Sequence, residues 1–141
     1  IVCRDADLIK ASKKAVLARM LNAGQSCIAA KRFIVHKDIK EDFINNIIKI
    51  LDNMKLDDPS NTTTQIGPLA RKDILSDLKI QLEDALKKGA KLRYQMSDVP
   101  SNGYFFPPSI VDDVNPSMDI YYNETFGPLF TIFSYSSTLV L

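Results

Sequence analysis

The sequence predicts a layered α/β fold built around one hydrophobic core. Three segments of helix length, each with an apolar stripe, alternate with short runs of β-branched and aromatic residues, which is the pattern of helices packed on a sheet. The 141 residues suffice for one domain-sized core, and a hydrophobic content of 45% with 25% charged residues is ordinary for a globular protein. No repeat, low-complexity stretch or linker divides the chain.

The first helix is expected from about Ala6 to Asn22. Asp5 is a suitable N-cap and Gly24 a suitable stop. Helical spacing predicts an inner face made of small apolar residues, namely Leu8, Ala11, Ala15 and Ala18. The nearby lysines Lys10, Lys13 and Lys14 are interpreted as a solvated face of this helix. The run "RFIVH", residues 32–36, then predicts a strand.

A capping-box pattern marks the start of the second helix, because Asp38 is followed three residues later by Glu41. This helix is expected to end near Leu56, and its apolar stripe consists of Ile39, Phe43, Ile47, Leu51 and Met54. The following segment 57–69 is polar and rich in helix breakers, so a loop is predicted there.

The third helix is expected from about Ala70 to Lys88, with Gly89 just past its end. Its inward positions are Ile74, Leu75, Leu78, Leu82, Ala85 and Leu86. Residues 91–95 form a short strand candidate. The segment before residues 109–111 contains two prolines, which have no backbone N–H to donate to a neighbouring strand. It is therefore expected to be an edge strand at best. After a predicted loop over 115–128, the run "LFTIFSY", residues 129–135, is the clearest central strand.

Composition excludes several classes of function. A net charge of +1 gives no excess of basic residues of the kind that binds nucleic acid. No apolar run reaches the roughly 20 residues of a membrane span. Two cysteines in 141 residues favour free thiols in a reducing cytosol, hence a cytoplasmic protein. Cys3, within an apolar start, is expected in the core. His36 is the only histidine and is expected at the surface or a strand end, and no residues have zinc-site spacing, so no metal is predicted.

Cys27 is the main candidate for chemistry. The turn formed by Gly24 and Gln25 could aim backbone N–H groups at an oxyanion near its thiol, but local chemistry favours a small buried cysteine between helix and strand. A dyad with His36 is a weak alternative. Glu124 is either an ordinary loop carboxylate or an acceptor for a pair of ligand hydroxyls.

Five segments nevertheless resemble, in family order, the aldehyde dehydrogenase superfamily. They are "DADL" (5–8), "NAGQSCIAAKRF" (22–33), "IGPL" (66–69), "GYFFPPSIVDDV" (103–114) and "NETFGPL" (123–129). The amino-acid sequence around Cys27 is most similar to that of succinate-semialdehyde dehydrogenases. The resemblance implies a helix/sheet/helix catalytic domain with a mostly parallel sheet.

The same resemblance implies roles for three residues. Cys27 would be the thiol that attacks an aldehyde to form a thiohemiacetal, with its backbone N–H as half of the oxyanion hole. Hydride would pass to NAD or NADP, and water would hydrolyse the thioester. Glu124 would bind the nicotinamide ribose hydroxyls, and Phe126 would lie beside the nicotinamide. Asn123 departs from the family, which commonly has a second acidic residue there.

The resemblance also implies that other groups lie elsewhere in such enzymes. The general-base glutamate, the oxyanion-hole asparagine and the dinucleotide-binding domain precede a segment like this one. Residues 1–141 are therefore expected to be a partial catalytic domain without the NAD-binding domain, incomplete at both ends, with "TLVL" an unexpected ending. We expect no cofactor binding and no turnover by the chain alone. The alternative is a truncated, non-catalytic remnant or a self-associating scaffold.

Overall fold

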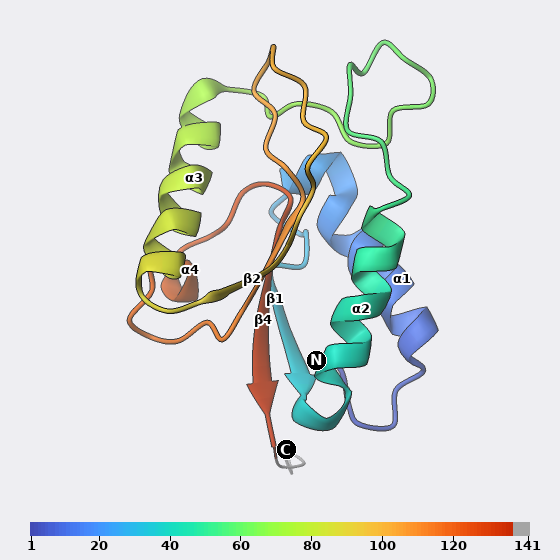
Figure 1. Ribbon diagram of the computed structural model, residues 1–141, viewed down its shortest axis with the longest axis vertical. Helices are drawn as coiled ribbons and strands as arrows, with labels where there is room; N and C mark the ends of the chain where they lie inside the picture. Colours follow the sequence, from blue (N-terminus) through green and yellow to red (C-terminus); the bar gives the residue numbers. More distant parts are fainter. Residues whose placement is uncertain (137–141) are drawn as a thin grey trace.

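The computed structural model, which describes residues 1–136, places a four-stranded sheet between two pairs of helices (Figure 1). The strands, in their order across the sheet, are β1 (Arg32–His36), β4 (Leu129–Tyr135), β3 (Ser109–Asp112) and β2 (Lys91–Gln95). β4 pairs in parallel with β1 and β3, and β2 pairs antiparallel with β3. The helices are α1 (Leu8–Met20) and α2 (Lys40–Leu51) on one face, and α3 (Lys72–Lys87) and α4 (Asp119–Tyr122) on the other. The predicted layered, mostly parallel α/β fold is confirmed.

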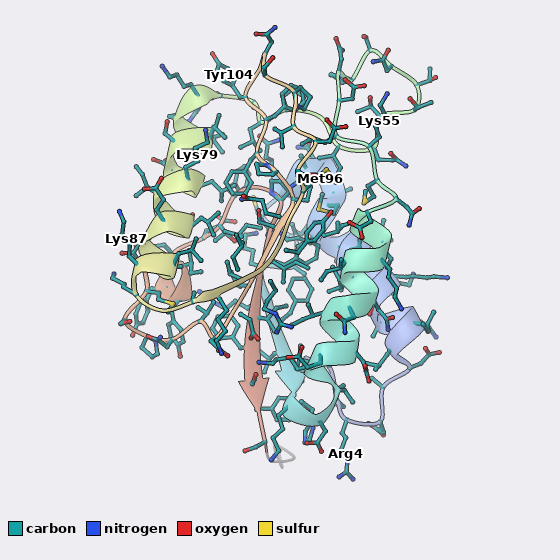
Figure 2. The ribbon with its side chains drawn as sticks, viewed as in Figure 1. Arg4, Lys55, Lys79, Lys87, Met96 and Tyr104 are labelled. Carbon is teal, nitrogen blue, oxygen red and sulfur yellow. The ribbon has the colours of Figure 1, made fainter. Side chains whose placement is uncertain are left out.

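The sheet separates two apolar clusters, because successive residues of a strand point to opposite faces. On β4, Phe130 and Ile132 pack toward α1 and α2, whereas Leu129 packs toward α3 and α4. Figure 2 shows side chains filling the space on both sides of the sheet, with Met96 inside and Lys79 on the exposed side of α3. Within residues 1–136, no helix is both long enough and apolar enough to cross a membrane.

Most predicted elements are confirmed. The strands at 32–36, 91–95 and 129–135 have the expected bounds, and β4 lies centrally between β1 and β3. The expected loop over 115–128 is wrong in one respect, because it contains α4. This four-residue helix is held by a tertiary contact, since the N–H of Asp119 donates to Oδ2 of Asp84 on α3 at 2.9 Å. Residues 137–141, including the "TLVL" ending, lie outside the described part of the chain.

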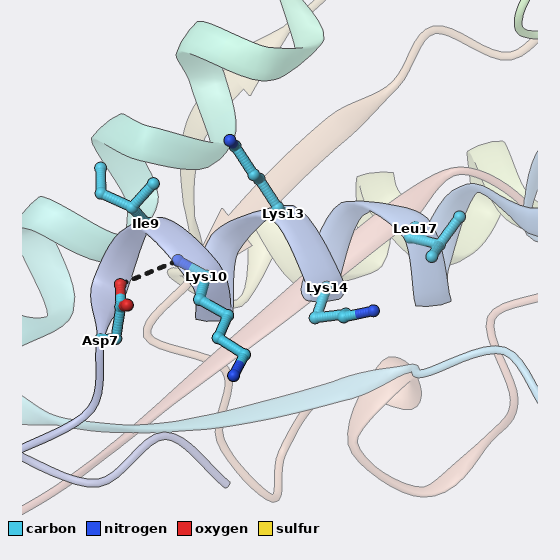
Figure 3. A pocket seen from close by; sticks show the side chains of 6 residues that line it. All are labelled: Asp7, Ile9, Lys10, Lys13, Lys14 and Leu17. Atoms are coloured by element: carbon cyan, nitrogen blue, oxygen red, sulfur yellow. Dashed lines mark hydrogen bonds between the residues drawn. The ribbon is translucent and has the colours of Figure 1, made fainter.

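The start of the first helix differs from the expectation. Asp7, not Asp5, is the N-cap, and its Oδ1 accepts from the N–H of Lys10 at 3.0 Å (Figure 3). Most of the predicted inner face is confirmed, because Leu8, Ala11 and Ala15 pack against the core cluster. Ala18 is exposed, however, and the buried residues of α1 are Ser12, Val16, Arg19 and Met20. The predicted solvated lysine face is confirmed, with Lys10, Lys13 and Lys14 all exposed.

The predicted capping box of the second helix does not form. The N–H of Asp38 donates to Nδ1 of His36 at 3.3 Å, and a short 3-10 turn over Lys37–Ile39 precedes α2. Glu41 instead accepts from Arg93 of β2, with Nη1–Oε1 at 3.0 Å. A partner distant in sequence has therefore replaced the local cap. α2 ends at Leu51, five residues before the expected position.

Cys3 is exposed, so its predicted core position is wrong. Val2 forms a parallel bridge with Val35 and packs against the cluster shared with α1 and α2. Because adjacent residues of an extended segment point to opposite sides, Cys3 faces away from that cluster.

Candidate functional site

Cys27 lies in a β-turn between α1 and β1. The N–H of Ala29 donates to the carbonyl of Ser26 at 3.1 Å, which places Cys27 at the second position of the turn. The residue is exposed, so the expectation of a buried cysteine is wrong. Among residues 1–136, the backbone N–H of Cys27 has no protein acceptor. The thiol and a free donor are thus presented together at the surface.

The chain reaches this turn through three consecutive left-handed residues. Asn22, Ala23 and Gly24 have φ values of 52°, 53° and 78°, and they end α1 sharply. Gln25 then ties the segment to the "IGPL" loop, because its Oε1 accepts from the N–H of Ala70 at 2.8 Å. Glycine is required at position 24, since a Cβ there would lie 2.2 Å from the carbonyl oxygen of Gly127.

The Cys27 turn and the "NETFGPL" segment share one cavity of about 160 Å³. Its walls include Cys27, Lys31, Glu124 and the buried Thr125. Lys31 Nζ lies 2.8 Å from Oε1 of Glu124, whose side chain is half exposed. The hydroxyl of Thr125 is buried and has no partner in the described residues. The thiol of Cys27 and the nearby ammonium of Lys31 therefore meet a carboxylate from a distant part of the sequence.

Phe126 lines a second cavity, of about 130 Å³, on the α3 side of the same segment. Glu124 belongs to both cavities and so marks the boundary between them. Its main-chain carbonyl accepts from Nε2 of Gln81 on α3 at 3.1 Å. The predicted cofactor residues Glu124 and Phe126 therefore lie side by side next to the cavity of Cys27.

A fully buried arginine joins the two halves of the site. Arg19 on α1 donates to the carbonyl of Ala30 at 3.2 Å, to that of Thr125 at 2.7 Å and to that of Gly127. Burial lowers the pKa of Arg19 to about 10, and the charge of Glu124 opposes this shift. The guanidinium stays protonated at neutral pH and connects the Cys27 turn to the Glu124 segment. Neither Arg19 nor Lys31 is found by sequence patterns, because the partners of both come from a distant segment.

The weak alternative of a Cys27–His36 dyad is not formed. His36 lies at the opposite end of β1, where its ring packs edge-on against Tyr135 at a centroid distance of 5.2 Å. Its predicted strand-end position is confirmed, although the side chain is buried there. In residues 1–136, no three His, Cys, Asp or Glu side chains gather as metal ligands.

The donor set fits a nicotinamide dinucleotide. One oxygen of Glu124 is paired with Lys31, and the carboxylate retains free lone pairs for a pair of hydroxyls. The aromatic ring of Phe126 supplies an apolar wall next to that carboxylate.

The chain is similar to known proteins along almost its whole length. The family model described as "Aldehyde dehydrogenase family" matches residues 1–139. The chain is 46% identical over 129 residues to a probable NADP(+) succinate-semialdehyde dehydrogenase of Synechocystis, and 41% identical over 133 residues to one of Mycobacterium avium. These alignments cover 92% and 94% of this chain and 28% of each relative. The chain thus spans between a quarter and a third of the length of the curated relatives it matches.

Solved structures agree with the sequence comparison. Succinate-semialdehyde dehydrogenase from Burkholderia pseudomallei superposes with a TM-score of 0.91 at 31% identity, over 96% of this chain and 28% of that one. An NAD+ complex of aldehyde dehydrogenase from Bacillus cereus superposes with a TM-score of 0.90 at 31% identity, over 97% of this chain and 28% of that one.

Proposed function

Because the chain belongs to the aldehyde dehydrogenase family, we propose that it carries the nucleophile and part of the cofactor site of an NAD(P)-dependent aldehyde dehydrogenase. The observation that carries this proposal is the cavity shared by the exposed Cys27 and Glu124, beside the cavity of Phe126. A surface cysteine in a turn with a free N–H is suited to attack a carbonyl group, whereas a buried one is not.

Each residue has a defined task in this proposal. The thiolate of Cys27 attacks the aldehyde carbon, and the backbone N–H of Cys27 donates to the resulting oxyanion. Glu124 would accept hydrogen bonds from the ribose hydroxyls, and the ring of Phe126, which lines the adjoining cavity, would lie beside the nicotinamide. The dinucleotide, when bound, supplies the hydride acceptor. Water then hydrolyses the thioester and frees Cys27.

We propose succinate semialdehyde as the aldehyde and NADP as the favoured dinucleotide. Support comes from the names of the Synechocystis and Mycobacterium relatives, which specify both. We also propose a cytoplasmic location, since Cys3 and Cys27 are both free thiols.

The 141 residues alone are expected to show no turnover. The resemblance assigns the general base and the dinucleotide domain to parts of the family fold that are not among these residues. Loss of a general base costs about 10²–10⁴ in rate, and loss of one oxyanion donor costs about 10²–10³. The alternative function is therefore a non-catalytic scaffold that retains the site geometry.

The test has two arms. Purified chain is incubated with succinate semialdehyde and NADP or NAD, and no reduced dinucleotide is expected at 340 nm, because the acceptor is not held. The chain is then treated with p-nitrophenyl acetate, and peptide mass spectrometry is expected to find the acetyl group on Cys27 before Cys3. Cys27→Ala should abolish the fast labelling.

Two results would be contrary to expectation. Steady aldehyde oxidation by the purified chain would contradict the expected lack of turnover, and with it the view that these residues hold only part of the site. Equal acetylation of Cys27 and Cys3, both of which are exposed, would show that the Cys27 turn provides no nucleophile site.

A further inference from the structure

Lys31 makes an unusual set of contacts with the Cys27 turn. Its ammonium donates to three main-chain carbonyls, those of Ser26 at 2.9 Å, Cys27 at 3.3 Å and Ala29 at 3.2 Å. Its side chain is only 16% exposed. A surface lysine without a structural task would extend into water, where its charge is better solvated. The ammonium instead lies against the turn that carries the thiol.

Two further contacts hold Lys31 itself in place. Its main-chain carbonyl accepts from the hydroxyl of Thr131 on β4 at 2.7 Å, and its ammonium pairs with Glu124 at 2.8 Å. The lysine is thus anchored to the central strand at one end and to the candidate cofactor carboxylate at the other. A lysine held both at its main chain and at its ammonium can set the orientation of the groups that the ammonium contacts.

The contact with Ser26 has a consequence for Cys27. The carbonyl of Ser26 and the N–H of Cys27 belong to one peptide unit, and none of the described peptide bonds is cis. In a planar trans peptide the C=O and N–H point in opposite directions. The carbonyl of Ser26 accepts from Lys31 and also from the N–H of Ala29 in the turn, so the N–H of Cys27 points away from both donors. This N–H is the one without a protein acceptor in residues 1–136.

We propose that Lys31 is a positioning residue that orients the Ser26–Cys27 peptide, so that the free N–H of Cys27 is preset to receive an oxyanion formed at the Cys27 thiol. This role rests on the proposed function, because it presumes attack by Cys27 on a carbonyl group. It goes beyond that function because the orientation of the Cys27 N–H is attributed to Lys31. The Lys31 side chain itself touches neither the reacting carbon nor the oxyanion.

The test compares two reactions of the same thiol. p-Nitrophenyl acetate acylates Cys27: the sulfur bonds to the carbonyl carbon, a tetrahedral oxyanion forms, p-nitrophenolate leaves, and the thiol proton goes to solvent. Iodoacetamide alkylates Cys27 by displacement of iodide, and no oxyanion forms. An oriented N–H accelerates only the first reaction, so the ratio of the two rates reports on the oxyanion donor.

Lys31→Met in the full 141-residue chain should lower the acylation rate of Cys27 about tenfold, less than the loss of an entire donor. The alkylation rate should change less than twofold. Lys31→Arg, which keeps a cation able to donate to carbonyls, should restore part of the ratio. Lys14→Met removes an exposed lysine of α1 and should leave both rates unchanged. Alkylation of Cys3 in each variant serves as the internal reference.

The inference is overturned if acylation and alkylation fall in parallel in Lys31→Met, or if neither changes. Should Lys31→Met lose its far-ultraviolet circular dichroism signal, Lys31→Gln, whose amide NH2 can still donate to carbonyls, is subjected to the same comparison and the same criteria. Failure of the proposed function gives a different result: the unsubstituted chain would be alkylated at Cys27 but not acylated.

Discussion

Among single residues, the glycine that precedes the candidate nucleophile is the most constrained. Gly24 combines a φ of +78° with a backbone contact, because its α-carbon faces the carbonyl of Gly127 in the Glu124 segment. Arg19 on α1 donates to the same carbonyl. These two residues fix the distance between the Cys27 turn and the Glu124 segment.

Gly24→Ala is expected to destabilise the chain by about 2–5 kcal/mol, the sum of a left-handed alanine and an overpacked contact. Gly89→Ala is the matched control, since Gly89 has a φ of +99° but nothing within 4 Å of the added methyl group. That variant should cost only about 1–2 kcal/mol. Urea denaturation at pH 7 measures both. Equal losses would show that the approach of Gly24 to Gly127 can relax freely.

Among the elements, α4 depends most on its surroundings. A helix of four residues has almost no stability of its own. Asp84 at the end of α3 holds its first N–H, and Lys88 pairs with the other oxygen of that carboxylate at 2.7 Å. α4 leads directly into Asn123 and Glu124, so this contact supports the candidate cofactor segment.

This contact predicts a pH dependence. The N–H of Asp119, and then Lys88, lower the pKa of Asp84 below its ordinary value of 3.8. A carboxyl group whose pKa is lower in the folded state contributes stability above its unfolded pKa and loses it as the pH falls through the folded pKa. Asp84→Asn should therefore lower the melting temperature at pH 7 and reduce its further loss between about pH 4 and pH 2.

Glu83→Gln on the same helix is the control, because within residues 1–136 the side chain of Glu83 makes only a long, exposed contact with Lys87 at 3.8 Å. Its melting temperature should follow that of the unsubstituted chain at each pH. If Asp84→Asn and Glu83→Gln behave alike, the link between α3 and α4 contributes nothing to stability.

For the molecule as a whole, the exposed apolar surface predicts self-association, as the alternative scaffold function also would. A groove of about 390 Å³ along α1 has the exposed Ile9 and Leu17 at its two ends, with three lysines between them (Figure 3). On the other face of the sheet, a cavity of about 380 Å³ is lined by Ile34, Phe133 and the exposed Tyr122. Apolar surface of this kind is often covered by a partner.

Light scattering of the purified chain should therefore give a mass that rises above 15.8 kDa as the concentration increases. Leu17→Lys and Tyr122→Lys, made separately, identify which surface is responsible, because a charge in an apolar contact is costly to bury. A constant monomer mass up to millimolar concentration would disprove self-association.

The helices and strands could be predicted from the order of residues because their signals are local. Apolar spacing in α3 and the β-branched runs of β1 and β4 depend on neighbours a few positions away. The same holds for the motifs around Cys27 and Glu124, which pointed to the family before any contact was known.

Caps and burial were less predictable, because competing partners come from distant parts of the chain. Glu41 pairs with Arg93, 52 positions away, and does not form the expected capping box. Arg19 is buried where it meets its acceptors, the carbonyls of Thr125 and Gly127, which lie 106 and 108 positions away. No pattern within one helix reveals such partners. The residues therefore specified the layered fold and the thiol, whereas the pairing of Lys31 with Glu124 and the close approach of Gly24 to Gly127 arise only when the sheet brings the two segments together.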